Sequence, residues 1–549
     1  MTNLEIPLKK RSPLYRFFEM VPAIISYGAV ILLVVLSLVS PLWAAVYLLL
    51  VAVTVFVKAI TVSYHMIIGR RRLSQAEAVP WHEFLSELEN PIEYVGHHHS
   101  RNRFYVQHKQ HLETIAANQK SYPAPSALYN AVIIATYNEP YEVLQGTIAS
   151  VAATTYNNQQ LIVFLAYEER GGPETEEVAS RLRKEFGDTF FAFETVKHPK
   201  NLPGEVIGKG GNITYAGRRL ETFLQDRRID PEQVIVTTLD SDNRPHRGYF
   251  DYVAYEYILH LDRKYLSYQP ISLFLNNIWD VPAPMRVVAT GNSFWNIISA
   301  VRPHTLRNFA SHSQPMDALI EMDFWSTRTI VEDGHQYWRS YFHFNGNYGV
   351  VPIFVPIYQD AVMSDTYVKT LKAQFVQLRR WAYGASDVPY VAVRLFTRKR
   401  TVPFFGGLAR LFRLLDGHIT LACMSVLVTF GGWVPLVINA HATQSVAANQ
   451  LPEVLGLIQR VAMVGLVIMV FLTFKMLPPR PSRYKRRRTF AMVIQWVLMP
   501  VTALCYSAVS AYYSQTRLLL GKYMTKFDVT EKATAVSVEQ AKQRRKNKK

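Results

Sequence analysis

VIVTTLDSDN, at residues 234–243, is a run of β-forming residues that ends on two aspartates, Asp240 and Asp242. Similar runs, AVIIAT at 131–136 and LIVFLA at 161–166, recur upstream and are separated by stretches with helical spacing. Short β-branched runs that alternate with helices indicate layered α/β structure. We therefore expect a doubly wound α/β domain with a mixed sheet over residues 125–392.

Polar residues follow these expected strands at the points where the strands end. In open sheets of this kind, ligands collect beyond the carboxyl ends of the strands. Two carboxylates spaced i and i+2 can turn toward one ion, and oxygen ligands suit a hard cation such as Mg²⁺ or Mn²⁺. The alternative for the aspartates is a solvated turn that caps the next helix. The residues expected to share one crevice are Thr136, Glu139, Glu168, Glu169, Asp240 and Asp242.

The bulk composition favours a membrane protein. The chain has 549 residues, a formal net charge of +18 and 49% hydrophobic residues, which gather in runs. Lys and Arg lie beside these runs, so the basic excess indicates membrane lipids rather than nucleic acid as the partner. The only two cysteines, Cys423 and Cys505, both lie in apolar runs, so no disulfide framework is expected in the soluble part.

Two apolar runs near the N-terminus, 21–40 and 42–60, are each long enough to cross a bilayer, and Pro41 favours a tight turn between them. Basic clusters at 9–11 and 70–72 flank the pair, which places the soluble domain in the cytosol by the positive-inside rule. We expect no cleaved signal peptide, because no small-residue cleavage site follows the first run.

The C-terminal part has three more apolar runs, at 417–440, 456–477 and 490–514, with a basic loop before the last. Five full spans would leave the basic tail outside, against the same rule. We therefore expect one C-terminal segment to be re-entrant or to lie flat, with Pro500 as the break. FFGGLARLFRLLDGH at 404–418 is typical of an interfacial helix or of an amphipathic helix packed on the soluble domain.

The resulting plan places an integral protein in the plasma (inner) membrane with its main domain in the cytosol. Histidines at 97–99, with His108 and His111, fall in a polar linker and are expected to be solvated or lipid-facing rather than metal-binding. The expected divisions are an N-terminal transmembrane hairpin (1–72), a helical or polar linker (73–124), the α/β domain (125–392), an interfacial amphipathic helix (393–418), C-terminal transmembrane segments (419–522) and a basic cytosolic tail (523–549).

Four short motifs in order carry a resemblance to a known family: TYNE at 136–139, DSD at 240–242, VED at 331–333 and QLRRW at 377–381. Together they resemble the membrane-integrated family 2 glycosyltransferases, the group of cellulose, hyaluronan and chitin synthases and of ceramide glucosyltransferase. The resemblance covers about residues 125–390 and implies a cytosolic GT-A-like domain flanked by transmembrane helices.

The resemblance also implies roles. Asp333 would be the general base of an inverting transfer, supported by Glu332, and Asp240 and Asp242 would hold Mg²⁺ or Mn²⁺. The expected donor, with a UDP-sugar favoured, would contact Thr136, Tyr137, Glu139, Glu169, Lys209, Asn212, Asp240, Gln377 and Arg380. The expected acceptor contacts are Trp381, Gln269 and His312.

Several of these assignments have a structural alternative. QLRRW could be a packed amphipathic edge, the glycine-rich stretch around Lys209 a surface loop, and His312 a hydrogen-bonded structural histidine. The family's early aspartate is absent after the second expected strand. Glu169 stands in its place, which leaves the donor open.

The function predicted from the sequence is metal-dependent transfer of a sugar from a nucleotide-sugar to a polysaccharide or lipid acceptor at the cytosolic membrane face. The alternative is a non-catalytic membrane receptor with a nucleotide-sugar-binding domain. A transporter has little support, because Arg460 is the main ionisable residue in the apolar runs.

Overall fold

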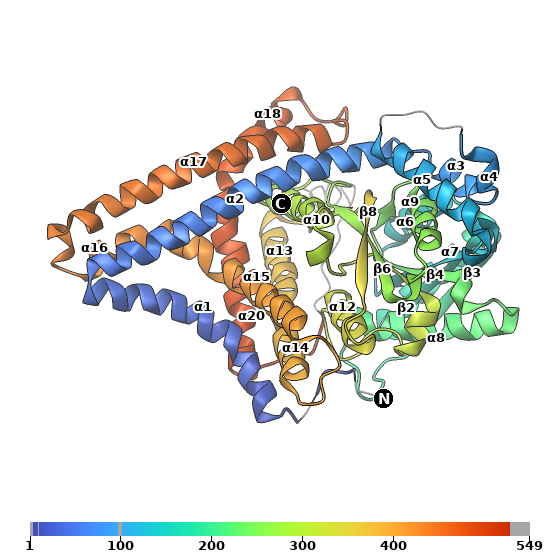
Figure 1. Ribbon diagram of the computed structural model, residues 1–549, viewed down its shortest axis with the longest axis horizontal. Coiled ribbons are helices and arrows are strands. Elements are labelled where there is room, and N and C mark those ends of the chain that lie inside the picture. The colour runs from blue at the N-terminus through green and yellow to red at the C-terminus, as the bar shows by residue number, and fades with distance from the viewer. Residues whose placement is uncertain (1–3, 9, 97–101, 528–549) are drawn as a thin grey trace, which may run out of the picture.

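The structure is a computed structural model that describes residues 4–8, 10–96 and 102–527 (Figure 1). Residues 528–549, most of the expected basic tail, and the histidines at 97–99 lie outside this range.

The central element is an eight-stranded mixed sheet with the strand order β3-β2-β1-β4-β7-β6-β8-β5. Strands β3, β2, β1 and β4 are parallel to one another, whereas β7 pairs antiparallel with both β4 and β6. The expected α/β class with a mixed sheet is confirmed. The strands are β1 Tyr129–Thr136, β2 Leu161–Glu168, β3 Ala192–His198, β4 Val234–Asp240, β5 Arg244–Pro245, β6 Leu266–Leu273, β7 Ser313–Pro315 and β8 Gly349–Tyr358.

The sheet is buried on both faces, which explains why its strands read as continuous apolar runs. Successive side chains of a strand point to opposite faces. Val132 and Ile134 of β1 accordingly enter one core, and Ala131 and Ile133 enter the other. The first core is covered by α6 (Tyr141–Ala152), α7 (Pro173–Phe186), α9 (Tyr249–Leu259) and α10 (Ala283–Ala300), and the second by α8 (Lys209–Arg227), α11 (Met316–Glu321), α12 (Glu332–His343) and α14 (Asp387–Phe396).

The linker before the sheet is helical and packs on the first core. Trp81 stacks on Tyr252 of α9 with ring centroids 3.5 Å apart, and buried His108 lies between the Glu87 carboxylate and the Tyr255 hydroxyl. The linker helices are α3 (Trp81–Glu87), α4 (Pro91–Tyr94) and α5 (Arg103–Ala117).

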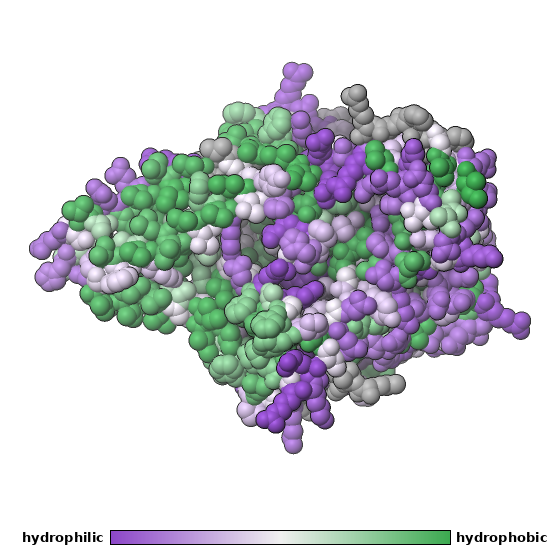
Figure 2. All heavy atoms as spheres, viewed as in Figure 1, coloured by the Kyte–Doolittle hydropathy of each residue, from purple (hydrophilic) through white to green (hydrophobic). Residues whose placement is uncertain are grey.

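Four helical stretches in the described part of the chain are long and apolar enough to cross a membrane. They are Pro13–Val39 (α1), Pro41–Glu77 (α2), Phe404–Ile438 (α15 and α16) and Arg486–Leu519 (α18 to α20). A further long helix, α17 (Val446–Met476), packs along α2. Figure 2 shows apolar residues spread over this half of the molecule, whereas the sheet half is mostly hydrophilic on its surface.

Two helical segments lie where the sequence predicted an interfacial helix and a break at Pro500. Residues 404–418 are the first half of one continuous helix, α15 (Phe404–Phe430), which contains no proline and carries its one glycine pair, Gly406 and Gly407, in the first turn. Around Pro500 the chain stays helical but irregular, with a 3₁₀ turn at Gln495–Leu498, α19 (Met499–Thr502) and a π-helical turn at Ala503–Ala508.

Candidate active site

The carboxyl ends of the four parallel strands form one edge of the sheet, and the predicted site residues lie there. Thr136 ends β1, Glu168 ends β2 and Asp240 ends β4. Ala135 of β1 pairs with Asp240, so the TYNE turn and the DSD turn leave the sheet side by side.

Lys209 lies at the centre of the site. Its Nζ is 2.8 Å from Asp240 Oδ1 and 3.1 Å from Asp333 Oδ1, so one ammonium joins residues from three distant parts of the chain. The Lys209 side chain is buried, which alone would lower its pKa, but the Asp240 and Asp333 carboxylates raise the pKa well above the usual range. The ammonium therefore stays charged at neutral pH.

Asp333 and Glu332 open α12 and have different surroundings. An acidic first turn suits the positive end of the helix dipole. About 20% of the Asp333 side-chain surface is exposed, and its carboxylate contacts Lys209. Glu332 is 2% exposed, and its Oε2 has no hydrogen-bond partner among the described residues. Burial, and next the Asp333 charge, raise the pKa of Glu332 to about 7, so Glu332 holds a proton at a higher pH than an ordinary glutamate does.

The close packing around Glu332 depends on Gly210, the second residue of α8. A Cβ there would lie 2.3 Å from the Ser326 carbonyl oxygen and 3.3 Å from Glu332 Cβ. Glycine at this position lets α8 approach α12 closely enough for Lys209 to reach Asp333.

Asp242 is buried and held by its neighbours. Its Oδ2 accepts from the Asp360 backbone N–H at 3.1 Å, and its carbonyl oxygen accepts from Asn276 Nδ2 at 3.1 Å. With the Asn243 amide turned so that its nitrogen faces the carboxylate, that nitrogen is 3.1 Å from Asp242 Oδ1.

The acidic residues fit a divalent cation only in part. Within the described residues, no group of three or more His, Cys, Asp or Glu side chains is placed to hold a metal ion. Mg²⁺ commonly uses one or two carboxylates and completes its shell with water and substrate phosphates. The Asp240 and Asp242 carboxylates therefore suit an ion that arrives with a diphosphate, rather than one held by protein side chains alone.

The TYNE turn is held together by Glu139. Its Oε2 accepts from Thr136 Oγ1 at 2.7 Å and from the Tyr137 backbone N–H at 2.8 Å. Asn212 of α8 donates through Nδ2 to the Ala166 carbonyl oxygen at 2.9 Å. In this structure Glu139 and Asn212 shape the crevice wall.

A charged group that was not predicted from the sequence lies at the ends of β2 and β3. His198 is 3.1 Å from Glu168 through Nδ1 and 3.1 Å from Glu205 through Nε2. Burial alone would lower the His198 pKa, but the two carboxylates raise it to about 9. Glu169 Oε2 accepts from the Lys200 backbone N–H at 2.9 Å. These contacts fix the loop at residues 199–208 that leads to Lys209.

The QLRRW motif lies on α13 (Tyr367–Ala382), beside the same crevice. Gln377 Oε1 accepts from Gln374 Nε2 at 3.0 Å. Burial raises the pKa of Glu332, and the positive charge of Arg380 partly opposes this rise. Trp381 is partly exposed, and its ring centroid is 5.9 Å from that of Phe274.

The segment at the end of the described chain also reaches the site, and this contact was not predicted from the sequence. The Phe527 backbone N–H donates to the Ile207 carbonyl oxygen at 2.7 Å. The Phe527 ring centroid is 3.8 Å from the Arg380 guanidinium carbon. A phenylalanine in an otherwise polar, basic segment is the only signal that could have indicated this contact.

The two remaining predicted acceptor residues are buried. Gln269 Oε1 accepts from the Phe309 backbone N–H at 2.7 Å, and His312 Nδ1 is 2.9 Å from the Phe309 carbonyl oxygen. Burial lowers the pKa of His312. Both side chains hold the loop before β7 from inside the domain.

No protein-family model matches the chain, and no curated protein matches it. Solved structures give weak similarity. A mannosyltransferase from Pyrobaculum calidifontis, in complex with GDP-Man and Mn²⁺, is 16% identical over 76% of this chain and 99% of its own, with a TM-score of 0.36.

Two further structures are similarly distant. TarS from S. aureus, residues 1–349 with UDP-GlcNAc, is 12% identical over 72% of this chain and 93% of its own, with a TM-score of 0.34. GalNAc-T7 with UDP, GalNAc and Mn²⁺ is 10% identical over 53% of this chain and 58% of its own, with a TM-score of 0.32. At these scores no residue role is transferred, so the site rests on its own geometry.

Proposed function

We propose that this protein is an inverting glycosyltransferase that transfers a sugar from a nucleotide-sugar donor to a polysaccharide or lipid acceptor. It would belong to the membrane-integrated family 2 enzymes and work at the cytosolic face of the plasma membrane. The observation that carries the proposal is the Lys209 ammonium held between Asp240 and Asp333 at the carboxyl edge of the parallel strands.

Asp333 would act on the acceptor as the general base. The acceptor hydroxyl oxygen attacks the anomeric carbon from the face opposite the diphosphate, the bond from that carbon to the phosphate oxygen breaks, and the hydroxyl proton passes to Asp333. The Lys209 ammonium, 3.1 Å away, positions the Asp333 carboxylate at the crevice. Glu332 fixes the start of α12 so that Asp333 faces the crevice.

The donor side needs positive charge for the leaving diphosphate. Arg380 can make bidentate contacts with phosphate oxygens, and Lys209 supplies a compact charge beside Asp240. Mg²⁺ or Mn²⁺ held by Asp240 and Asp242 would act as a Lewis acid on the phosphate. The TYNE turn and Glu169 border the part of the crevice where the nucleoside, with uridine favoured, would lie.

The acceptor would rest on Trp381, whose flat apolar face suits a sugar ring or a lipid headgroup. Trp381 contacts Phe274, two residues before Asn276, and the Asn276 amide donates to the Asp242 carbonyl oxygen. This chain of contacts supports an acceptor position next to the acidic residues. Gln269 and His312 would act through the loop that they hold.

The test is release of free nucleotide from a panel of UDP- and GDP-sugars by the purified native chain, with Mg²⁺, with Mn²⁺ and with a chelator. We expect turnover of at least one donor and its loss with the chelator. Asp323→Asn removes an exposed carboxylate that is paired with Arg218. It is the control for Asp333→Asn and is expected to keep full activity. A chain that binds a sugar nucleotide without turning it over would instead be the receptor. The mass of the product separates a polymer from a glycosylated lipid.

A further inference from the structure

The long helices divide into two groups by direction. Helices α1, α2, α15 and α17, here called the bundle, run from the sheet domain to a far tip (Figure 1). At that tip, Asn439 Nδ2 donates to the Ser37 carbonyl oxygen at 2.8 Å. At the domain end, Arg70 of α2 donates to the Lys475 carbonyl oxygen of α17 at 3.2 Å. These four helices extend between the domain end and the far tip (Figure 1).

The stretch Arg486–Leu519, here called the C-terminal apolar segment, runs differently. Near its start, Arg488 donates to the Trp279 carbonyl oxygen at 2.9 Å. At its end, the carbonyl oxygens of Leu518 and Leu519 accept from Arg16 at the start of α1. Both ends therefore lie at the domain end of the bundle, and Figure 1 shows α20 running across the bundle.

Length does not explain this path. As a helix, 34 residues span about 51 Å, more than the hydrocarbon core of about 30 Å. A crossing helix that began beside Trp279 would end near the Asn439 tip. Instead, Ser514 Oγ donates to the Arg379 carbonyl oxygen of α13 at 2.6 Å, and the Tyr512 hydroxyl donates at 3.3 Å to the carbonyl oxygen of Ser26, which lies about midway along α1.

In the C-terminal apolar segment, polar side chains face the protein and apolar side chains face outward, which is the opposite of a helix that faces water. Its side against the protein carries buried polar residues, among them Gln495, Thr502, Ser510, Ser514 and Gln515. Its outer side carries large apolar residues that are each more than half exposed and spaced by four, three and four residues, namely Phe490, Ile494, Val497 and Val501. An apolar stripe of this kind needs an apolar environment.

Basic residues beside the apolar stripe indicate what kind of apolar environment covers it. Lys485, Arg486 and Arg487 are exposed immediately before the stripe. Basic residues beside an apolar helix face are the pattern of a helix lying in the surface of a bilayer with anionic lipids.

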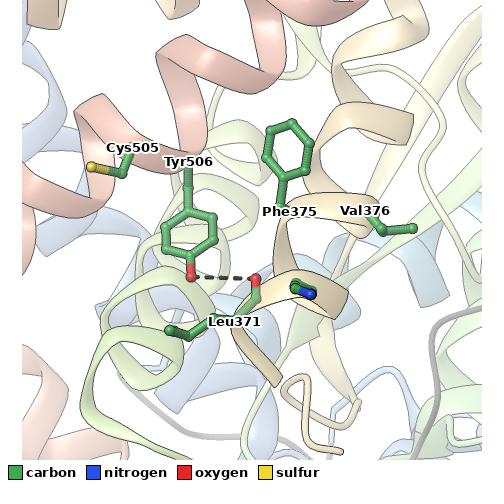
Figure 3. A pocket seen from close by; sticks show the side chains of 6 residues that line it. Leu371, Phe375, Val376, Cys505 and Tyr506 are labelled. Carbon is green, nitrogen blue, oxygen red and sulfur yellow. Dashed lines mark hydrogen bonds between the residues drawn. The ribbon is translucent and has the colours of Figure 1, made fainter. Parts of the chain in front are cut away.

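The irregular middle of the segment opens a pocket toward α13. The pocket has a volume of about 500 Å³. The Tyr506 hydroxyl donates to the Leu371 carbonyl oxygen at 3.3 Å at its edge (Figure 3). Its walls are apolar apart from Lys372, so its chemistry suits an acyl chain beneath an anionic headgroup. The lining residues are Leu371, Lys372, Phe375, Val376, Cys505 and Tyr506.

We propose that the C-terminal apolar segment does not cross the membrane. It lies in the leaflet on the side of the sheet domain, with its outer stripe and the pocket against lipid acyl chains, and it braces α13. Four crossings then leave both ends of the described chain on one side. This inference stands independently of the sugar-transfer proposal, because it concerns topology alone.

Thiol labelling of the full chain in intact cells tests the path. Single cysteines are introduced at exposed positions in a Cys505→Ser background: Ser482→Cys before the segment, Lys522→Cys after it and Gln444→Cys at the far tip. With a membrane-impermeant maleimide, we expect positions 482 and 522 to be labelled from the same side and 444 from the opposite side. Labelling of 482 and 522 from opposite sides would overturn the proposal.

A second measurement needs no new cysteine. Cys505 is exposed and lies near the middle of the segment, whereas Cys423 is buried. A fluorophore on Cys505 of the native chain in vesicles should be quenched more by lipids with a nitroxide near the headgroup than by lipids with a nitroxide deep in the acyl chain. A crossing segment would place Cys505 near the bilayer centre and reverse this order.

Discussion

Replacement of Lys209 by methionine tests whether one ammonium holds the candidate site together. The substitution keeps most of the side-chain volume and removes the charge that lies 2.8 Å from Asp240 and 3.1 Å from Asp333. Loss of one partner from a buried ion pair costs about 3–5 kcal/mol. Asp240 and Asp333 keep 35% and 20% of their side-chain surface exposed and can regain some hydration, so we expect about 2–4 kcal/mol.

Lys197→Met is the matched control, because Lys197 makes an ion pair of 2.9 Å with Glu176 on the open surface. Ion pairs between exposed side chains contribute little to stability. At about 2–4 °C per kcal/mol, a loss of about 3 kcal/mol in the Lys209 variant lowers the thermal midpoint by about 6–12 °C, and the control lowers it by less than about 4 °C. Both are measured in the same detergent at the same scan rate. Equal shifts in the two variants would refute the central role of Lys209.

Three further outcomes follow from contacts in and around the crevice. Because the folded-state pKa of His198 is raised to about 9, its contribution to stability is full below about pH 6.5 and is lost as the pH rises through 9. The thermal midpoint of the His198→Gln variant, measured across this pH range, should lack the decline seen in the native chain. A variant with the same pH profile as the native chain would contradict this prediction. Gly210→Ala places a Cβ 2.3 Å from the Ser326 carbonyl oxygen and should cost about 1–3 kcal/mol in unfolding free energy. Gly291→Ala, in a helix with open space, should be neutral or stabilising. Trp381→Ala should raise the acceptor KM about tenfold, the equivalent of about 1.4 kcal/mol of ring contact; an unchanged KM would remove Trp381 from the acceptor site.

The sheet could be predicted from the sequence because its strands obey a local rule. Strands covered on both faces contain apolar residues at nearly every position, and VIVTTL and AVIIAT show this without any knowledge of their partners. The convergence of Thr136 and Asp240 at one edge follows from the parallel arrangement alone.

The partners of the individual side chains could not be predicted in the same way. The contact between Lys209 and Asp333 depends on how closely α8 approaches α12, which Gly210 decides in three dimensions. Glu139 was expected to contact the nucleotide-sugar because its carboxylate is polar and follows a strand. In the structure this carboxylate accepts hydrogen bonds from Thr136 and Tyr137 of its own turn. The approach of Phe527 to Arg380 links residues almost 150 positions apart and has no local pattern.

The helical half shows the same limit. The apolar runs mark long helices correctly, but hydropathy does not show how a helix is oriented relative to the others. The irregular helix around Pro500 has the length and composition of a span, and only its contacts at both ends show where it runs.

The most direct test of the account is the separation of donor binding from turnover in Asp333→Asn, measured on the full chain with the donor that the native protein uses. The variant keeps the size and hydrogen-bonding capacity of the side chain and loses the proton acceptor. The account predicts a donor dissociation constant within about threefold of the native value and a kcat lower by about 10²–10⁴. A variant that turns over its donor at the native rate would show that the acceptor proton goes elsewhere.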